Sequence, residues 1–345
     1  MVAHVTLSYA EVTSAVKHAL RRVGADEANA KIVAHHLALA EASGTSTHGL
    51  AQLSSYVIDI ENDRLVPDAK PRVIRDSAVT AVVHGGWTFG QVGAETAVGL
   101  AVDKAKASGV AVCGLVACHH IGRLGHYVEW AAERGCTTFV WVGGLGEEDP
   151  RVVPHGGADR IVGTNPIAFG FPSLTTDPFV FDFATSSIAG NKIVEARRKA
   201  VKLPVDSIVD ANGEASTDPE DFFDGGALLP FGGHKGYAIN LAAEWLGRIL
   251  IDSASYAEDS KSNAFLRRQG VLFLAISVDA LADGESVRES ADEMHDRISA
   301  SRPARDHSRV TVPGMRSAES RRSSFENGIT VDAEIWDQVR ALAEP

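Results

Sequence analysis

The sequence is poor in cysteine and lacks the cysteine spacings that build structural sites. Three cysteines occur among 345 residues, at Cys113, Cys118 and Cys136, and none lies in a CxxC pair. An odd number without such spacing weighs against a disulfide framework and against a structural zinc cage. We therefore expect a chain that works in the reducing cytoplasm.

Long apolar runs and an excess of positive charge are also missing. No stretch approaches the roughly 18 apolar residues of a membrane span, and the start, MVAHVTLSYAEV, lacks a basic segment followed by an apolar run. We therefore expect no signal peptide. With 33 Lys and Arg against 45 Asp and Glu, the formal net charge is −12, whereas nucleic acids and anionic membranes bind basic surfaces. We expect no nucleic-acid and no membrane partner.

Several common catalytic and cofactor motifs are absent as well. GxGxxG does not occur, and its nearest approach, GLGEED from Gly144, lacks the third glycine. The GxSxG elbow, the P-loop and HExxH are equally missing. No single motif therefore identifies a function.

The residues that are present predict a globular α/β protein that begins with a helical layer. Apolar residues make up 45% and charged residues 23%, as in globular proteins. Ser8 and Glu11 form a capping box before a helical apolar pattern that stops at Gly24. A second helix is expected from Asp26 to about Ser43, and an apolar stripe after the turn GTST predicts a third.

From about residue 78 onward, apolar runs alternate with helical patterns. The runs are AVTAVVH, VAVCGLVA, TTFVWVGG, PFVFDFATS and VLFLAIS, and RVTVPG continues the alternation before two C-terminal helices. This pattern predicts an α/β sheet with at least some parallel strand pairing. The polar segments 203–224 and 251–268 are typical of surface loops.

A histidine stands at the start of the third predicted helix. Gln52 and Tyr56 follow His48 by four and eight positions, so all three lie on one helix face beside the apolar stripe. A row of polar side chains suits a pocket wall, and a histidine with an ordinary pKa of about 6.5 suits proton transfer. A surface histidine behind a capping threonine fits the same spacing, and spacing alone leaves both interpretations open.

Two more histidines follow a predicted strand directly. His119 and His120 stand at its carboxyl end, where open α/β sheets bind ligands. The next residues, IGRLG, offer glycines for close backbone approach and Arg123 for a phosphate or carboxylate. Zinc is the alternative, but these two histidines and His126 do not have a standard ligand spacing, and we expect no metal.

Three further segments carry polar groups in turns or at strand ends. Thr164 and Asn165 in GTNPIAFGFP offer hydrogen bonds to a substrate, and DFATS, at 182–186, ends a predicted strand shortly before Lys192. GGHKG, at 232–236, begins a helix with free N–H groups and a lysine, which suits an anion. Each segment is also compatible with an ordinary loop or helix start.

Taken together, six ordered segments resemble the malate/L-lactate dehydrogenase type 2 family, which includes sulfolactate and ureidoglycolate dehydrogenase-like members and a hydroxycarboxylate dehydrogenase branch. They are STHGL, CHHIGRLGHYVEWAAERG, VGTNPIAFGFP, DFATSSIAGNKI, LLPFGGHKGYAINLAAEWLG and VPGMRSAESRR. The resemblance implies an α/β fold of the L-sulfolactate dehydrogenase type, with a non-Rossmann mixed-sheet cofactor domain, which explains the missing glycine motif. It also implies NAD or NADP as cofactor, a small 2-hydroxy or 2-oxo acid as substrate, and a homodimer or larger homo-oligomer.

The resemblance assigns roles to residues of this chain. His48 matches the proton donor and acceptor, while Thr47 and Lys192 orient it or polarise the substrate oxygen. The implied substrate contacts are Gln52, Tyr56 and Thr164. The implied cofactor contacts are His120, Ile121, Gly122, Arg123, Leu124, Asp182, Phe183, Ala184, His234, Lys235, Gly314, Met315 and Arg316. The implied regions are a helical substrate-side region, a cofactor-binding core and a C-terminal helical segment that packs back on the first, at 1–75, 76–310 and 311–345.

Two positions depart from the family pattern. Gln52 stands where many relatives have arginine, and a neutral amide cannot hold a carboxylate in a charged fork. AGNK, at 189–192, replaces the more usual ARGK. Both changes resemble the branch with broad 2-oxo acid preference. The expected reaction is hydride transfer between nicotinamide and substrate C2, with His48 moving the hydroxyl proton.

Three other interpretations stay open. The same scaffold and cofactor serve reductases of cyclic 2-imino acids. A metal-dependent hydrolase is the alternative from another class, built on His48, His119, His120 and Asp182. A catalytically silent protein would bind cofactor without turnover, although the retained His48 and Thr47 argue against it.

Overall fold

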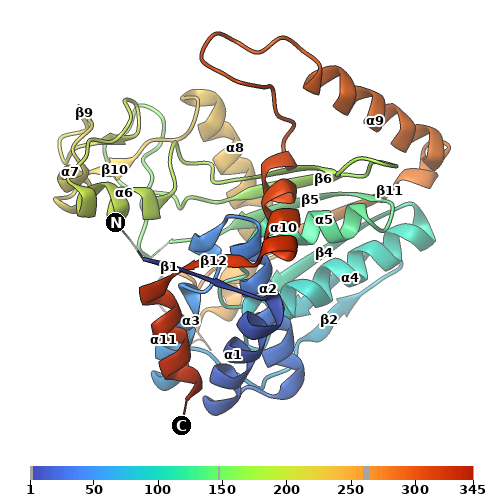
Figure 1. Ribbon diagram of the computed structural model, residues 1–345, viewed down its shortest axis with the longest axis horizontal. Helices are drawn as coiled ribbons and strands as arrows, with labels where there is room; N and C mark the ends of the chain where they lie inside the picture. The colour runs from blue at the N-terminus through green and yellow to red at the C-terminus, as the bar shows by residue number, and fades with distance from the viewer. Residues whose placement is uncertain (1–2, 147, 259–264, 345) are drawn as a thin grey trace.

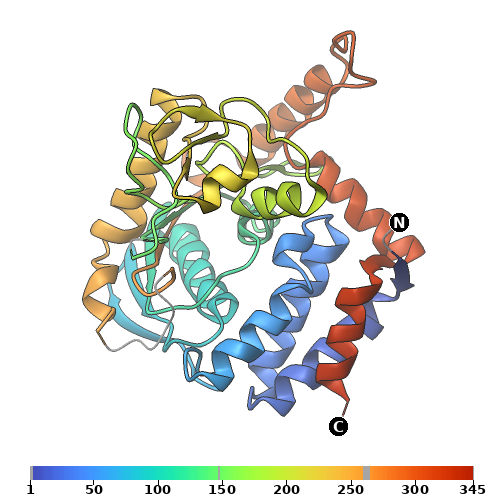
Figure 2. The ribbon, with the colours of Figure 1, turned by 90° about the vertical axis from the view of Figure 1, so that its left-hand side faces the viewer.

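The N-terminal residues form the predicted helical layer. The computed structural model describes residues 3–146, 148–258 and 265–344. Ser8 and Glu11 close the predicted capping box at the first helix, and the Asp26 carboxylate caps the second by accepting from a backbone amide. The three helices, which form one group in Figure 2, are α1 (Tyr9–Arg22), α2 (Glu27–Ala42) and α3 (Gln52–Glu61).

The C-terminal end of the chain packs onto this layer. β12 (Ile329–Asp332) pairs antiparallel with β1 (His4–Leu7). α11 (Ala333–Ala343) lies against α1, and α10 (Met315–Asn327) lies against α2 (Figures 1 and 2). Burying an aliphatic side chain stabilises a fold by about 1.5–3 kcal/mol. The shared core includes Val16, Leu20, Leu37, Ile329 and Val339.

A seven-stranded mixed sheet forms the centre of the molecule, in the order β2-β3-β4-β11-β5-β6-β7. The strands are β2 (Arg72–Asp76), β3 (Thr80–His84), β4 (Val110–Val116), β5 (Cys136–Gly143), β6 (Ile167–Phe171), β7 (Phe179–Phe183) and β11 (Gly270–Ser277). Within the described residues, β3 and β4 are the one parallel pair of this sheet, and its other neighbours are antiparallel. The α/β class is confirmed, and the sheet is not the mostly parallel Rossmann sheet.

Helices cover both faces of this sheet. They are α4 (Gly90–Ser108) and α5 (Leu124–Ala132) on one face, and α8 (His234–Glu244) with a π-helical turn (Trp245–Ile249) on the other (Figure 1). At Gly143 of β5 a side chain is excluded, because a Cβ would lie 2.7 Å from the Ala243 carbonyl oxygen. The glycine therefore lets α8 approach the sheet closely.

A small subdomain lies between β7 and α8 in the chain. Its elements are α6 (Gly190–Lys199), β8 (Ile208–Val209), β9 (Ala215–Ser216), α7 (Pro219–Phe223) and β10 (Ala227–Leu228). The short strands form an antiparallel sheet in the order β10-β8-β9. The prediction of a surface loop at 203–224 is therefore wrong, because Leu203, Ile208 and Phe222 are buried in a separate hydrophobic core of this subdomain.

Other element boundaries differ from the expectation. GTNPIAFGFP contains the strand β6, whereas RVTVPG forms no strand. The loop predicted at 251–268 contains a 3₁₀ helix, Ser253–Tyr256, and its residues 259–264 lie outside the described part of the chain. A short 3₁₀ helix, Val278–Ala280, leads to α9 (Gly284–Ser299), which projects from the body of the molecule (Figure 1).

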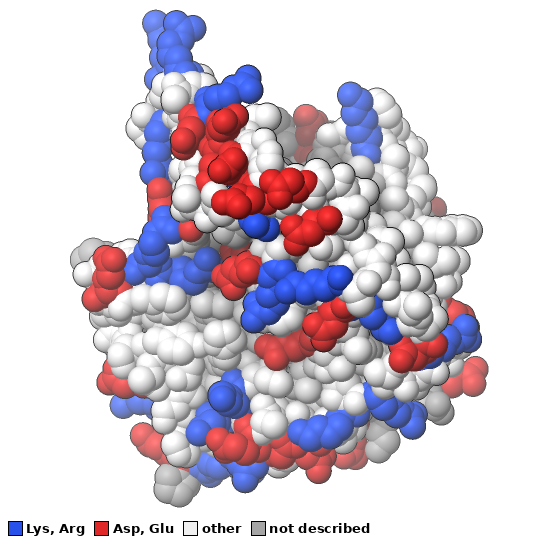
Figure 3. Space-filling view, turned by 90° about the vertical axis from the view of Figure 1, so that its right-hand side faces the viewer, with Lys and Arg blue, Asp and Glu red and all other residues white. Residues whose placement is uncertain are grey.

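The charged side chains on the face drawn in Figure 3 are mixed in sign, with lysine and arginine interspersed with aspartate and glutamate. Among the helices that the structure describes, none is both long and apolar enough to cross a bilayer.

Candidate active site

His48 lies in a tight turn that leads into α3. The turn is the 3₁₀ helix Ser46–His48, and residues 49–51 separate it from α3, so His48 lies before the helix and not on it as the sequence predicted. The Leu50 amide donates to the Glu41 carboxylate at 2.9 Å, which ties the turn to α2. A Cβ at Gly49 would collide with that carboxylate, so glycine is required for the contact.

Gln52 and Tyr56 lie one turn apart on α3, as predicted, but their surroundings differ. Gln52 Nε2 donates to the Thr47 carbonyl oxygen at 2.7 Å and so braces the turn that carries His48. The Thr47 residue is otherwise exposed. Tyr56 is buried, with 1% of its surface exposed.

Four side chains form a hydrogen-bonded chain that ends at His48. Its imidazole stacks on that of His120, with ring planes 8° apart and His48 Nδ1 3.3 Å from His120 Nε2. His120 Nδ1 lies 2.8 Å from the Tyr56 hydroxyl oxygen. Gln91 Nε2 donates to the same hydroxyl at 2.7 Å. The structure thus brings together three predicted site residues and adds Gln91.

Burial keeps the two histidines of this hydrogen-bonded chain, His48 and His120, neutral. It lowers the pKa of His48 below its ordinary value; the charge of Asp182 opposes this shift and that of Arg123 adds to it. Burial, followed by the neighbouring imidazoles, holds the pKa of His120 well below its ordinary value. At neutral pH each imidazole therefore has one N–H group and one lone pair.

Contacts of the neighbouring residue His119 hold the segment that carries His120 in place. His119 Nε2 lies 2.9 Å from the Asp59 carboxylate, and the His119 carbonyl oxygen accepts from Gln269 Nε2 at 3.0 Å. The N-terminus of α4 passes so close that a Cβ at Gly90 would lie 2.1 Å from the same carbonyl oxygen. His119 therefore has a positioning role in this structure.

A cavity of about 410 Å³ lies beside the turn of His48. Thr45, three positions before His48, lines it. This volume is within the range of about 300–1,000 Å³ that is usual for small-molecule sites. The predicted cofactor contacts that line the cavity are Arg123, Asp182, Phe183, Gly314 and Arg316.

The guanidinium of Arg123 is held in the cavity wall by a buried ion pair. It donates to both carboxylate oxygens of Glu129, at 2.9 and 3.0 Å, and Arg321 donates to the same carboxylate at 2.9 Å. These guanidinium groups hold the pKa of Glu129 below its ordinary value, although burial acts in the opposite direction. The Asp182 carboxylate also acts on Arg123, so the net positive charge of this wall comes from the further guanidinium of Arg316, and such a charge suits an anionic ligand.

The other predicted contacts do not line the cavity. Lys192 is exposed on α6, and the Thr164 carbonyl oxygen accepts from the Thr185 hydroxyl at 2.9 Å. His234 and Lys235 begin α8. Their roles stay predictions. The same holds for His120, Ile121, Gly122, Leu124, Ala184 and Met315.

The four residues proposed for a metal-dependent hydrolase do not form a metal group. His119 pairs with Asp59, His120 with Tyr56 and His48, and the Asp182 carboxylate accepts from the Gly125 amide at 2.7 Å. Among the residues that the structure describes, the one set with metal-ligand geometry lies elsewhere.

Sequence reasoning missed Asp59, Gln91 and Glu129. Asp59 lies 60 positions from His119, and Gln91 lies 35 positions from Tyr56. Each is a polar residue that lies buried in a helix, and no motif marks it. A buried polar residue on an apolar helix face was the available signal, because such a group needs a partner.

The family match and the similar solved structures identify a hydroxyacid dehydrogenase. The chain belongs to the malate/L-lactate dehydrogenase family, whose pattern it matches over residues 7–340. This confirms the resemblance seen in the ordered segments, and the enzyme class with it.

Several relatives cover almost the whole chain. The L-sulfolactate dehydrogenase of Methanocaldococcus jannaschii is 32% identical over 94% of this chain and 92% of its own. The Δ1-pyrroline-2-carboxylate/Δ1-piperideine-2-carboxylate reductase of Pseudomonas putida is 33% identical over 98% and 97%. The solved sulfolactate dehydrogenase of M. jannaschii superposes with a TM-score of 0.87 at 30% identity, over 98% of this chain and 96% of that chain. These matches confirm the L-sulfolactate dehydrogenase-like fold.

Proposed function

We propose that this protein transfers a hydride between NAD or NADP and C2 of a small 2-hydroxy or 2-oxo acid. The observation that carries the proposal is the neutral His48 beside a cavity lined by Arg123 and Asp182. Such a histidine suits proton transfer to or from a substrate oxygen, and the cationic wall suits a carboxylate or phosphate.

The residues that line the cavity support an anionic cofactor. Gly314, with a φ of 97°, caps the N-terminus of α10, where free amide groups and the helix dipole favour a phosphate. Arg316 and Arg123 add positive charge, and Phe183 offers an apolar surface for a ring. When bound, the nicotinamide would accept or supply the hydride.

His48 would hold the proton of the substrate oxygen at Nε2. To accept it, His48 must donate from Nδ1 to His120 Nε2, and His120 Nδ1 must donate to the Tyr56 oxygen. Tyr56 would then donate to Gln91 Oε1, which is buried and has no hydrogen-bond partner in the present orientation of the amide. Turning the Gln91 amide over exchanges Nε2 and Oε1, so that Oε1 faces the Tyr56 hydroxyl and no other heavy atom moves. Thr47 and Lys192 would orient the substrate oxygen, as the family pattern implies.

The test is an absorbance assay of NADH and NADPH oxidation with a panel of 2-oxo acids. We expect substrate-dependent oxidation of at least one reduced cofactor with no added metal. A folded protein that oxidises neither, or an activity that a chelator abolishes and zinc restores, would refute the proposal.

A reductase of cyclic 2-imino acids is the second candidate. The similarity to the Pseudomonas putida reductase favours it. Including Δ1-piperideine-2-carboxylate in the same panel separates the two, because its reduction with no turnover of any 2-oxo acid would favour the imine.

Gln52 provides a test of substrate preference. In Gln52→Arg, a charged fork would favour the second carboxylate of oxaloacetate over a bulky apolar 2-oxo acid. We expect the ratio of kcat/KM to shift by about 1.5–3 kcal/mol if the site is desolvated, and by less if water reaches it. Gln52→Met is the control: it removes the brace on Thr47 and should lower both activities together. An unchanged ratio in Gln52→Arg would mean that position 52 does not contact the substrate.

We also propose a cytoplasmic homodimer or larger homo-oligomer. Apolar side chains are exposed along α8 and the turn after it, including Leu241, Trp245 and Ile249 at 40%, 58% and 46%. Exposed apolar patches of this kind favour self-association. We retain the proposed regions 1–75, 76–310 and 311–345, since α11 and β12 pack on the N-terminal layer.

A further inference from the structure

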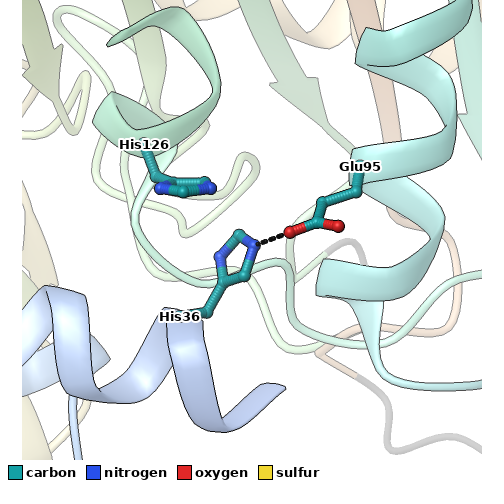
Figure 4. Close-up of side chains that lie close together, drawn as sticks. All are labelled: His36, Glu95 and His126. Atoms are coloured by element: carbon teal, nitrogen blue, oxygen red, sulfur yellow. Dashed lines mark hydrogen bonds and ion pairs between the residues drawn. The ribbon is translucent and has the colours of Figure 1, made fainter. Parts of the chain in front are cut away.

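Three helices bring two imidazoles and a carboxylate together away from the His48 chain. His36 on α2, Glu95 on α4 and His126 on α5 form what we call the His36 cluster (Figure 4). One potential ligand atom from each residue lies within 4.8 Å of the others. His36 Nε2 and Glu95 Oε1 are 2.9 Å apart, and the rings of His36 and His126 are 4.1 Å apart.

The carboxylate of this cluster lacks a cationic partner. Its side chain is 36% exposed, and within the described residues its ion-pair contact is to His36 alone. Imidazoles carry no permanent charge, so this partly buried carboxylate lacks a full counter-charge.

The third member, His126, has no hydrogen bond to its imidazole among the described residues. Its ring meets those of His35, His36 and Tyr127 edge-on. An imidazole has ring nitrogens that can bind a metal ion. A simple His36–Glu95 hydrogen bond leaves those nitrogens of His126 unused.

We propose that the His36 cluster binds a divalent transition-metal ion of the zinc type, with two imidazoles, one carboxylate and one water as ligands. This donor set and charge are those of His₂Glu zinc sites. Tetrahedral ligands about 2.0–2.1 Å from zinc stand about 3.3 Å apart, so side-chain shifts of about 1 Å are needed. The His36 proton must move from Nε2 to Nδ1 before Nε2 can bind the ion. Glu95 and His126 are partly exposed, which leaves room for the water ligand.

The bound ion would join the helical layer to the central sheet. α2 belongs to the layer that precedes His48, whereas α4 and α5 cover the sheet. The His126 amide donates to the Arg123 carbonyl oxygen, so the cluster lies next to the segment that lines the cavity. The ion would therefore stabilise the interface between these layers, and catalysis would not require it.

The experiment uses metal-stripped full-length protein with Zn²⁺ and Co²⁺ as probes. We expect one ion per chain by calorimetry, a tetrahedral Co²⁺ absorption spectrum, and a melting temperature raised by about 5 °C at saturating Zn²⁺. Activity of the stripped protein should persist.

Variants locate the ion. Glu95→Gln and His126→Ala should each weaken Zn²⁺ binding by about 100-fold or more, since loss of a group that only orients a ligand already costs about 10–100-fold. His307→Ala, which removes an exposed histidine, and His48→Gln should leave it unchanged. Binding that survives Glu95→Gln and His126→Ala, binding lost in His48→Gln, or no binding below millimolar Zn²⁺ would overturn the proposal. Failure of this metal-site proposal is distinct from failure of the proposed dehydrogenase function, because the first is measured as Zn²⁺ binding and the second as turnover.

Discussion

We expect His48→Gln to lower kcat by about 10²–10⁴-fold while cofactor affinity stays near that of the unmodified protein. Glutamine keeps a hydrogen bond to His120 but cannot take up a proton at pH 7. His48 lies at the end of the hydrogen-bonded chain and outside the set of cavity-lining residues, so the cavity itself should be preserved. Steady-state kinetics and titration of reduced cofactor by fluorescence measure the two quantities separately.

The pH profile provides the internal control for this result. Because burial lowers the pKa of His48, loss of the neutral base on acidification should begin below pH 6.5 in the oxidation direction. This fall in rate on the acidic side of the pH profile should disappear in His48→Gln. His18→Gln, on the exposed side of α1, should keep both rate and profile. Turnover close to normal in a folded His48→Gln protein would remove His48 from the mechanism.

The second large effect is expected at the buried carboxylate of Glu129. Glu129→Gln leaves the Arg123 guanidinium, whose residue is 5% exposed, without its counter-charge. Breaking a buried pair in this way costs about 3–5 kcal/mol, because the remaining charge is desolvated and uncompensated. The measurement is the free energy of unfolding in urea.

A surface ion pair is the matched control for this variant. Glu319 pairs with Arg309 in an exposed position, and Glu319→Gln should change stability little. Equal stability of Glu129→Gln and Glu319→Gln would show that water reaches the Arg123 guanidinium. In that case Arg123 would be a weaker anchor for an anion than we propose.

The fold could be predicted from the sequence where local patterns are strong. The capping box at Ser8 and the apolar runs that became β4, β5 and β11 depend on neighbours in the chain. The strand directions could not be predicted, because β11 inserts between β4 and β5 from more than a hundred residues away. The subdomain strands β8, β9 and β10 have two residues each, too few to show a period.

The sequence motifs single out residues that the structure brings together, but they do not show the hydrogen bonds between them. Motif resemblance placed His48, Tyr56 and His120 in one site. It could not show that Tyr56 joins His120 to Gln91, because that contact crosses three elements. The substrate contact of Gln52 stays a prediction, and the hydrogen bond of its amide to the Thr47 carbonyl oxygen could not be read from the motif.

The pairing of β1 with β12 has a consequence for the newly made chain. Helices α1 to α3 are synthesised long before Ile329, Val331 and Val339, which cover part of their apolar face. Contacts over such separations form late, since the chain between them must first be ordered. The nascent protein would thus carry an incomplete His48 layer until residues 329–339 have been made, with apolar surface available to chaperones. Removing the residues after Gly328 should leave every cavity-lining residue in place and still prevent that layer from closing.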